Sequence, residues 1–168
     1  MKNYKLPKLV ITDIDGVWTD GGMYYDQSGN EIKKFNTSDS GGVNFCKFLQ
    51  IPIAIITGED TNIVKNRAKK LNIDILFQGI TDKVIVASKI ISDLGIHWED
   101  VAFIGDDIGD YKLLKKVGIS GAPNNASEYI KDAVDIVTKK NGGDGAFREF
   151  VEIVIGKEKT LEILAKLI

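Results

Sequence analysis

The sequence predicts an α/β fold built on a doubly wound parallel sheet, and the alternation of its apolar patterns is what predicts it. Short apolar runs alternate along the chain with segments whose apolar residues recur at helical spacing. Strict alternation of strands and helices is typical of a parallel sheet with helices on both faces. The length of 168 residues suits one domain, so we expect residues 1–168 to form a single unit.

Each predicted element rests on one of these two patterns. The strands are short apolar runs of the kind that is buried on both faces of a sheet: 8–12, 52–57, 74–78, 101–104, 118–121 and 135–138. The helices have periodic apolar residues, and several have Asp, Ser or Thr near the start as caps: 39–49, 60–71, 82–94, 108–116 and 126–132. Residues 157–168 predict a short amphipathic helix that frays at the end of the chain.

The stretch from residue 17 to residue 35 interrupts the alternation. Residues that favour strands flank the turn-like segment 26–30, which predicts a hairpin inserted after the first strand. Its apolar side chains are too numerous for a hairpin left in water, so we expect it to pack on the domain or on another subunit. These side chains are Trp18, Met23, Tyr24, Tyr25, Ile32 and Phe35.

Composition excludes several classes of protein. With 24 acidic and 22 basic residues the net charge is −2, which provides no broad positive field for nucleic-acid binding. No apolar run approaches the roughly 20 residues of a membrane span, and the N-terminus lacks an apolar signal core. The lone cysteine, Cys46, permits no internal disulfide. We therefore expect a cytoplasmic protein without nucleic-acid or membrane partners.

Carboxylates gather where two predicted strands end. Asp13 and Asp15 follow the first strand, and Asp106, Asp107 and Asp110 follow the fourth. Each group alone is also typical of a turn or a helix cap. Together they place up to five carboxylates at one sheet edge, where ligands of open α/β sheets bind and where mutual repulsion calls for a cation. Oxygen ligands with a single histidine in the chain favour Mg²⁺.

A hard metal beside a free carboxylate suggests phosphoryl transfer. In this interpretation Asp13 is the nucleophile and Asp15 the general acid and base, while Lys83 offsets charge and Thr57 donates a hydrogen bond. Thr57 and Gly58 are also compatible with an ordinary strand-to-helix turn, and Lys83 is one of 20 lysines. Neither residue is persuasive alone.

Four short segments of the chain, in order, resemble the four motifs of the haloacid dehalogenase (HAD) phosphatase superfamily. They are Asp13-Ile14-Asp15-Gly16, Thr57-Gly58, Lys83, and Gly105-Asp106-Asp107 with Asp110. The resemblance implies a HAD-like Rossmannoid fold, with Mg²⁺ held by Asp13, the backbone carbonyl of Asp15 and Asp106. Asp107 and Asp110 are then expected in the surrounding second layer of the metal site.

Further segments, residues 15–22, 34–39, 78–79 and 142–149, resemble the small sugar-acid phosphatases that lack a cap domain. That family includes octulosonate 8-phosphate and nonulosonate 9-phosphate phosphatases. The resemblance implies a homotetramer in which hairpins form a central barrel and neighbouring subunits close each active site. It also implies that Asn36, Asp39 and Gly58 contact a phosphorylated sugar acid.

Two positions indicate the substrate branch within that family. The octulosonate branch typically carries arginine where this chain has Asn44 and Glu59. Glu59 with Arg67 and Lys70 instead resembles the nonulosonate branch, whose substrates are 2-keto-3-deoxynononate or N-acetylneuraminate 9-phosphate. Glutamate accepts bonds from sugar hydroxyls, and arginine and lysine pair with the sugar's own carboxylate. The octulosonate substrate stays open as the alternative.

The two arginines, Arg67 and Arg148, stand out among 22 basic residues. On a helical wheel Arg67 falls within the apolar arc of its helix, where it requires an anionic partner or a route to solvent. Arg148 follows a glycine-rich stretch, and is placed either to reach a neighbour's site or to cap the last helix.

Two functions of other classes compete with a phosphatase. A signalling receiver domain also uses an acidic pair, an acceptor aspartate, a threonine and a lysine, but its acceptor ends the third strand, where this chain has Phe77-Gln78. A noncatalytic oligomerisation module would not require Asp13 and Asp15.

Overall fold

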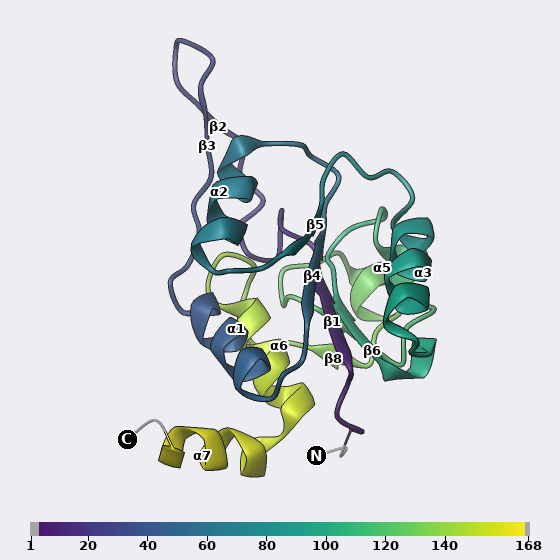
Figure 1. Ribbon diagram of the computed structural model, residues 1–168. Coiled ribbons are helices and arrows are strands. Elements are labelled where there is room, and N and C mark those ends of the chain that lie inside the picture. Colours follow the sequence, from purple (N-terminus) through teal and green to yellow (C-terminus); the bar gives the residue numbers. More distant parts are fainter. Residues whose placement is uncertain (1–3, 167–168) are drawn as a thin grey trace.

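The computed structural model describes residues 4–166, and its centre is a six-stranded parallel sheet (Figure 1). The strand order is β5-β4-β1-β6-β7-β8, so β1 is central and pairs with β4 on one side and β6 on the other. The strands are β1 Leu9–Thr12, β4 Ile53–Ile56, β5 Ile75–Phe77, β6 Val101–Ile104, β7 Ile119–Ala122 and β8 Ile136–Val137. Each falls in one of the six predicted runs or overlaps it, which confirms the predicted fold class.

Helices cover both faces of the sheet because successive strand residues point to opposite sides. Val10 packs with the helices α1, α2 and α6, whereas Leu9 and Ile11 pack with α3, α4 and α5. Figure 1 shows α1 and α6 on one side of the sheet and α3 and α5 on the other. The helices are α1 Asp39–Phe48, α2 Asn62–Lys70, α3 Lys83–Leu94, α4 Tyr111–Leu114, α5 Glu128–Lys131, α6 Ala146–Ile155 and α7 Lys157–Lys166, with a 3₁₀ turn at Trp98–Asp100.

Side-chain caps set the starts of the two helices that follow β4 and β5. The hydroxyl of Thr61 accepts a hydrogen bond from the Val64 amide at the start of α2. Asp82 accepts from the amides of Val84 and Ile85 at the start of α3, and Gly95 ends that helix in a left-handed conformation. The cap at Asp82 makes Lys83 the first helical residue.

The inserted hairpin is confirmed, although its paired part is shorter than the interrupted stretch. Its strands are β2 Tyr24–Tyr25 and β3 Glu31–Ile32, with Tyr24 opposite Ile32. Asp26 organises the turn by accepting hydrogen bonds from the Ser28 and Asn30 amides. The apolar side chains divide: Met23, Tyr24, Tyr25 and Ile32 are 44–60% exposed, whereas Trp18 is fully buried. The hairpin extends from the body of the chain (Figure 1).

Trp18 is therefore a core residue and not part of the hairpin surface. Its ring lies 4.6 Å from that of Phe147, and its indole N–H donates to the hydroxyl of Thr12 at 2.9 Å. That hydroxyl donates in turn to the backbone carbonyl of Asp13 at 2.7 Å. The core thereby braces the backbone immediately after β1.

The sequence prediction missed one helix and made two others too long. The missed helix, α6, buries Phe147, Phe150 and Val154, and the glycine-rich run before it concealed its start because Gly145 has a φ of 98°. The predicted helices 108–116 and 126–132 shrink to α4 and α5. Before α4 the Asp110 carboxylate accepts from backbone amides, and this holds residues 106–109 as a loop.

Helix α7 covers the predicted terminal helix as far as Lys166, and residues 167–168 lie outside the described residues. Along residues 4–166, none of the helices combines the length and the apolarity that a membrane crossing requires.

Candidate active site

The polar residues that follow β1, β4 and β6 meet in one cleft at the carboxyl edge of the sheet. The three strands are neighbours, so the chain topology itself brings Asp13, Thr57 and Asp106 together. Lys83 joins them from the start of α3. The cleft has a volume of about 480 Å³ and is lined by Asp13, Asp15, Gly16, Gly21, Thr57, Gly58, Glu59, Ile80, Thr81, Lys83, Asp106, Asp107, Gly109 and Asp110.

Asp13 is the most buried of the carboxylates on the first strand end. Its Oδ1 accepts the amide N–H of Ile14 at 2.7 Å, and its Oδ2 lies 2.7 Å from the ammonium of Lys83. Burial and the charge of Asp110 raise the pKa of Asp13 to about 7, although Lys83 opposes the shift. A carboxylate in this state is readily stabilised by a further positive charge.

Asp110 holds the other end of Lys83 and the loop after β6. Its Oδ1 lies 2.6 Å from the Lys83 ammonium, and its Oδ2 accepts from the amides of Asp106 and Asp107 at 2.9 and 3.3 Å. Both oxygens are therefore engaged, and the side chain is 1% exposed. This geometry makes Asp110 the residue that fixes Lys83 relative to the loop that carries Asp106.

Three carboxylates are close enough to share a metal ion. Oxygen atoms of Asp13, Asp106 and Asp110 lie within 4.8 Å of one another. Burial and the charges of Asp13, Asp110 and Asp107 raise the pKa of Asp106 to about 8, so the cluster lacks positive charge. Hard oxygen donors around a charge deficit fit a divalent cation such as Mg²⁺. The cluster therefore fits the predicted cofactor.

Gly16 leaves the space in which the Asp106 carboxylate lies. A Cβ at this position would overlap the Asp106 side chain, and the backbone has a φ of +78° that favours glycine. The glycine of the Asp13–Gly16 motif thus has a local steric reason: it lets the first and fourth strand ends approach each other.

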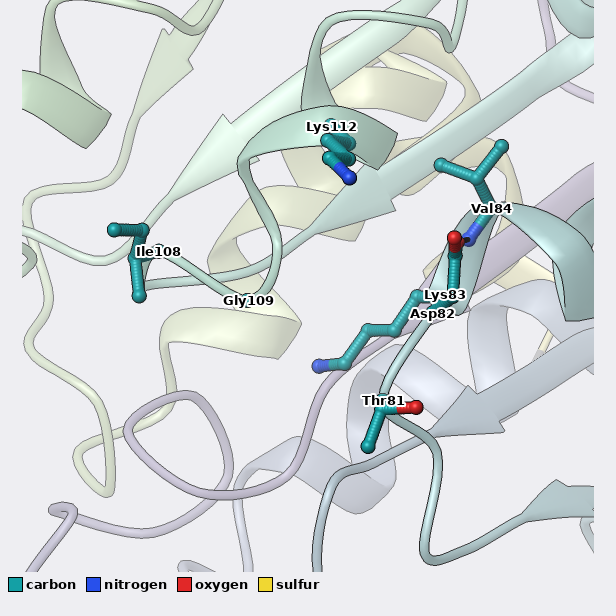
Figure 2. A pocket seen from close by; sticks show the side chains of 7 residues that line it. All are labelled: Thr81, Asp82, Lys83, Val84, Ile108, Gly109 and Lys112. Carbon is teal, nitrogen blue, oxygen red and sulfur yellow. Dashed lines mark hydrogen bonds between the residues drawn. The ribbon is translucent and has the colours of Figure 1, made fainter.

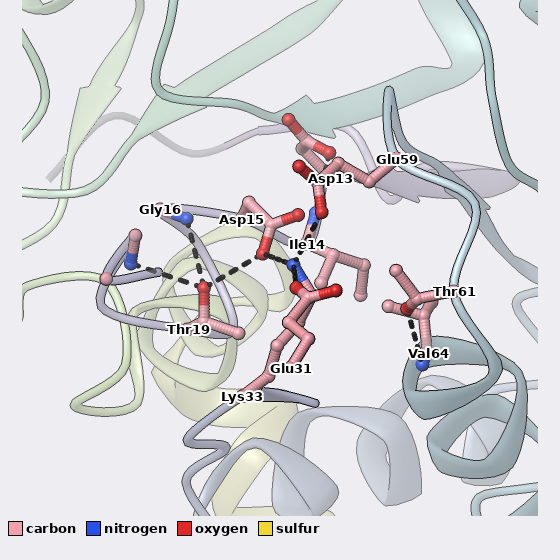
Figure 3. Close-up of polar contacts among 12 residues, drawn as sticks. Asp13, Ile14, Asp15, Gly16, Thr19, Glu31, Lys33, Glu59, Thr61 and Val64 are labelled. Atoms are coloured by element: carbon pink, nitrogen blue, oxygen red, sulfur yellow. Dashed lines mark hydrogen bonds and ion pairs between the residues drawn. The ribbon is translucent and has the colours of Figure 1, made fainter. Parts of the chain in front are cut away.

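A second cluster surrounds Lys33, beside Asp15 (Figure 3). The Lys33 ammonium lies 2.7 Å from Asp15 Oδ1, 3.0 Å from Glu31 Oε1 and 3.0 Å from Glu59 Oε2. Its side chain is 1% exposed. Burial alone lowers the pKa of this ammonium, but the three carboxylates outweigh burial and leave the pKa above its usual range. Lys33 is therefore held as a cation beside Asp15 and Glu59, two residues that line the cleft.

The remaining predicted residues of the fourth motif and the second strand end also line the cleft. Asp107 is exposed and accepts a hydrogen bond from the Tyr129 hydroxyl at 3.2 Å. Thr57 is buried in the cleft wall, whereas Gly58 is exposed. A smaller hollow of about 210 Å³ adjoins the cleft between the start of α3 and the loop before α4 (Figure 2), and Lys83 extends along it.

Four predicted substrate residues lie outside the cleft. The side-chain amide of Asn36 donates to the Gly143 carbonyl at 3.2 Å, and the backbone carbonyl of Asn36 accepts from Arg67 Nη2 at 3.2 Å. The Arg67 guanidinium lies 5.5 Å from the Phe35 ring centroid, with its Nε buried and unpartnered. Asp39 is fully buried, and Lys70 is exposed on α2. Their contact with substrate stays a prediction.

Asp39 and Arg148 support each other at the contact of α1 with α6. The backbone amide of Arg148 donates to Asp39 Oδ1 at 3.1 Å, while Asp39 Oδ2 is buried without a hydrogen-bond partner. Burial raises the pKa of Asp39 to about 6, although the Arg148 amide and the charges of Arg67, Arg148 and Lys140 oppose the shift. The Arg148 side chain pairs with Glu152 at 2.8 Å.

The site also contains three residues that the sequence did not predict: Lys33, Glu31 and Thr19. Thr19 donates to Asp15 Oδ1 at 3.3 Å and accepts the Gly16 and Gly21 amides at 3.3 and 3.2 Å. The only sequence signal for Lys33 is its strand spacing from Glu31, which places both side chains on one face of the hairpin. That signal is weak because charged residues are common in hairpins.

The sheet, the cleft and the ordered strand-end residues define a class of hydrolase. Residues 55–150 match the haloacid dehalogenase-like hydrolases, and the chain belongs to this family. The prediction of a phosphoric monoester hydrolase is thereby confirmed at the level of the family, against a signalling receiver domain or a noncatalytic module.

Relatives of the chain within the family are sugar-acid phosphatases. The 3-deoxy-D-manno-octulosonate 8-phosphate phosphatase of Escherichia coli K12 is 38% identical over 148 residues, which cover 88% of this chain and 79% of that protein. The crystal structure of the Moraxella catarrhalis octulosonate 8-phosphate phosphatase, in complex with magnesium, phosphate and KDO, superposes with a TM-score of 0.92. It is 34% identical and covers 96% of this chain and 94% of that chain.

A cobalt-bound structure of the corresponding Haemophilus influenzae phosphatase has a TM-score of 0.84 and 37% identity, with coverage of 89% of this chain and 87% of that one. Divalent metals in two related structures agree with the carboxylate cluster described above.

Proposed function

We propose that this protein is a Mg²⁺-dependent phosphatase that hydrolyses a phosphorylated sugar acid through a phosphoryl group carried on Asp13. The observation that carries the proposal is the contact of Asp13 Oδ2 with Lys83 at 2.7 Å, inside a cleft where the other strand-end carboxylates converge. A buried carboxylate beside one lysine and a metal site is suited to attack phosphorus.

The residues divide the reaction into two steps. In the first, an Asp13 oxygen forms a bond to phosphorus as the bond to the sugar oxygen breaks, and Asp15 gives its proton to that leaving oxygen. In the second, Asp15 takes a proton from water, whose oxygen bonds to phosphorus and releases Asp13 and inorganic phosphate. Lys83 offsets the charge on the transferring phosphoryl oxygens, and Thr57 donates a hydrogen bond to them.

Asp13, Asp106 and the Asp15 backbone carbonyl would hold the magnesium ion. When bound, the metal neutralises charge on the phosphoryl oxygens and on the clustered carboxylates. Asp110 keeps Lys83 in reach through its 2.6 Å contact, and Asp107 stands at the rim.

For the sugar, we infer a nine-carbon α-keto acid phosphorylated at position 9: 2-keto-3-deoxynononate or N-acetylneuraminate 9-phosphate. Glu59 supports this because its side chain is 42% exposed at the cleft while one oxygen is held by Lys33. A carboxylate placed in this way accepts bonds from sugar hydroxyls and would repel the sugar's own carboxylate. Arg67 and Lys70 on α2 are the proposed partners of that carboxylate.

The second candidate substrate is 3-deoxy-D-manno-octulosonate 8-phosphate. The observation in its favour is the activity named for the Escherichia coli and Moraxella relatives. The two candidates differ in chain length, so they place the α-keto acid end at different distances from a phosphate bound beside Asp13.

We also propose that four copies assemble through their hairpins. Met23, Tyr24, Tyr25 and Ile32 offer a concentrated apolar surface on a projecting hairpin, which favours burial against another copy. Assembly would also give Asn36, Arg67 and Lys70, none of which is fully buried, a neighbour through which to complete a site. Mass in solution tests this, and a monomer at micromolar concentration would contradict it.

A substrate panel tests the function. Purified protein with Mg²⁺ is assayed for phosphate release from both nonulosonate 9-phosphates, octulosonate 8-phosphate and a hexose 6-phosphate as control. We expect the highest kcat/KM with a nonulosonate 9-phosphate. Preference for octulosonate 8-phosphate would transfer the assignment to the second candidate, and no release from any of them would contradict the phosphatase.

A further inference from the structure

Lys33 contacts two residues of the cleft lining, Asp15 and Glu59, and has no part in the proposed reaction steps. In β3 and the residue after it, side chains alternate in direction. Ile32 is 57% exposed, whereas Lys33 on the other side is sealed off with its side chain 1% exposed. Its ammonium contacts Glu31 from the hairpin, Asp15 from the loop after β1 and Glu59 from the loop after β4 (Figure 3). Three separate segments thus meet at one nitrogen atom.

The contact makes the two oxygens of Asp15 different. Oδ1 is held by Lys33 at 2.7 Å and by the Thr19 hydroxyl at 3.3 Å. Oδ2 is buried and has no hydrogen-bond partner. A buried carboxylate oxygen that is left without a partner is costly unless a ligand supplies one. The carboxylate is therefore fixed through Oδ1, and Oδ2 is the oxygen left without a partner to carry the exchangeable proton.

The same ammonium orients Glu59. Lys33 lies 3.0 Å from Glu59 Oε2, and the Glu59 side chain remains 42% exposed at the cleft. A glutamate on a loop ordinarily samples several rotamers, and an ion pair with a sealed lysine restricts it. Because Lys33 holds Asp15 at the same time, the positions of the two carboxylates relative to each other depend on it.

We propose that Lys33 is a positioning residue: its ammonium holds the proton-transferring carboxylate of Asp15 and the sugar-contacting carboxylate of Glu59 in one fixed relation. The proposal rests on the phosphatase function proposed above. It assigns to the hairpin a part in catalysis, because the hairpin supplies both Lys33 and its third partner, Glu31.

A purely structural role of Lys33 predicts a different effect of its replacement on activity. Removing one partner of a buried ion pair commonly destabilises the fold, because the charges that remain are left uncompensated. If Lys33 served the fold alone, its replacement would change all activities together through the amount of folded protein. If it positions Asp15, the loss falls on reactions whose leaving group requires a proton.

The experiment compares two leaving groups in the intact protein with Mg²⁺. The sugar alkoxide of the preferred substrate in the panel requires protonation, whereas p-nitrophenolate departs without it. We expect Lys33→Met to lower kcat/KM for the sugar phosphate about a hundredfold, near the lower end of what a positioned acid contributes. For p-nitrophenyl phosphate we expect kcat/KM within about threefold of wild type, because no proton transfer assists departure.

Lys34→Met is the matched control. Lys34 is the adjacent lysine, its side chain is 57% exposed, and its ion-pair distances to Asp20 and Asp144 are 3.9 Å. We expect this variant to keep both activities. Equal losses with the two substrates in Lys33→Met, or no loss with either, would overturn the positioning role.

Lys33→Arg is the second variant, and it carries the test if Lys33→Met does not fold. The guanidinium keeps the charge but presents its donors in a different geometry. We expect about a tenfold loss of kcat/KM with the sugar phosphate and none with the aryl phosphate. Unchanged or equally lowered activities would overturn the proposal. A wild-type protein inactive on every phosphate would overturn the proposed function and this inference together, whereas an active wild type with unselective variants overturns Lys33 alone.

Discussion

Two buried lysines organise the cleft in different ways. Lys83 starts a helix of the sheet framework and bridges Asp13 and Asp110 at 2.7 and 2.6 Å. Lys33 comes from the inserted hairpin and bridges Asp15, Glu31 and Glu59 at 2.7 to 3.0 Å. The first cluster is built from residues that follow strands of the central sheet, and the second is assembled from a hairpin and two loops.

The two clusters have different proposed roles: one carries out phosphoryl transfer, and the other positions the groups that contact the leaving sugar. The Lys83 cluster contains the proposed nucleophile and metal ligands, so every substrate depends on it. The Lys33 cluster adjoins the proposed acid and the proposed sugar contact, so its effects should vary with the substrate. The residues that every substrate requires thus follow strands of the sheet, whereas the inserted hairpin carries Lys33, whose effect depends on the substrate.

The largest expected effect is the loss of Asp13. Asp13→Asn keeps the shape of the side chain but removes the nucleophilic carboxylate, so we expect kcat/KM to fall at least about a thousandfold with alkyl and aryl phosphates alike. Phosphate release measures both. Asp93→Asn, at an exposed position of α3, is the control and should be active. Substantial activity of Asp13→Asn with the aryl ester would contradict the proposal that every substrate depends on the Lys83 cluster.

The second effect tests the approach of two strand ends. Gly16→Ala places a methyl group where the Asp106 carboxylate lies, so we expect Mg²⁺ affinity to fall about 10- to 100-fold, as when supporting residues of metal sites are changed. Calorimetric titration measures the affinity. Gly29→Ala is a matched control, because Gly29 has a similar φ of +82° with open space around it. Equal metal affinity in the two variants would show that Asp106 does not depend on Gly16.

The third effect concerns metal and pH. Without metal, Asp13 and Asp106 hold protons up to pKa values of about 7 and 8, above the usual 3.8. Raised acid pKa values contribute stability at low pH that is lost as pH rises through them. Mg²⁺ binds the ionised form, so its stabilisation should be larger at pH 8.5 than at pH 6.

At a hundred times its Kd, Mg²⁺ contributes about 2.7 kcal/mol, which corresponds to roughly 5 to 10 °C in Tm at pH 8.5. Thermal melts with and without the metal measure the shift. Asp106→Asn should abolish it and Lys33→Met should keep it. Loss of the Mg²⁺-dependent increase in Tm in Lys33→Met would show that metal binding also depends on the Lys33 cluster.

The smallest effect concerns Asp39, a buried carboxyl outside both clusters. Its folded pKa of about 6 lies above the usual 3.8, so its contribution to stability is present below about pH 4 and is lost as pH rises through 6. Asp39→Asn keeps an acceptor for the Arg148 amide and cannot ionise. Relative to this variant, the wild type should lose about 2 kcal/mol of unfolding free energy between pH 4 and pH 7. Urea unfolding with saturating Mg²⁺ measures it, and parallel pH curves would contradict the assignment.

The same contrast explains what the sequence could predict. Asp13, Thr57 and Asp106 each follow an apolar strand, and strand order in a parallel sheet brings such ends together. The alternating pattern therefore predicted both the sheet and its carboxyl edge. Lys33 follows no such rule, because its position depends on how a projecting hairpin folds back over the loop after β1.

Other differences have equally local causes. Helix α6 was missed because Gly142, Gly143 and Gly145 precede it, and glycine runs indicate loops. The helix expected at residues 108–116 starts only at Tyr111, because the Asp110 carboxylate accepts the amides of Asp106 and Asp107 and holds residues 106–109 as a loop. The wheel placed Arg67 among apolar residues, and the structure places it against Phe35 and Trp18. Its anionic partner stays a prediction.

The alternation along β3 limits how the hairpin can change in length. Side chains in a strand repeat every two residues, so removing one residue between Asp26 and Lys33 would exchange the directions of Ile32 and Lys33. An apolar side chain would then face Asp15 and the ammonium would enter water. Gly29 at the turn has open space around it, but its φ of +82° favours glycine over other residues. The hairpin is thus expected to tolerate insertions and deletions in pairs of residues, which keep Lys33 facing Asp15.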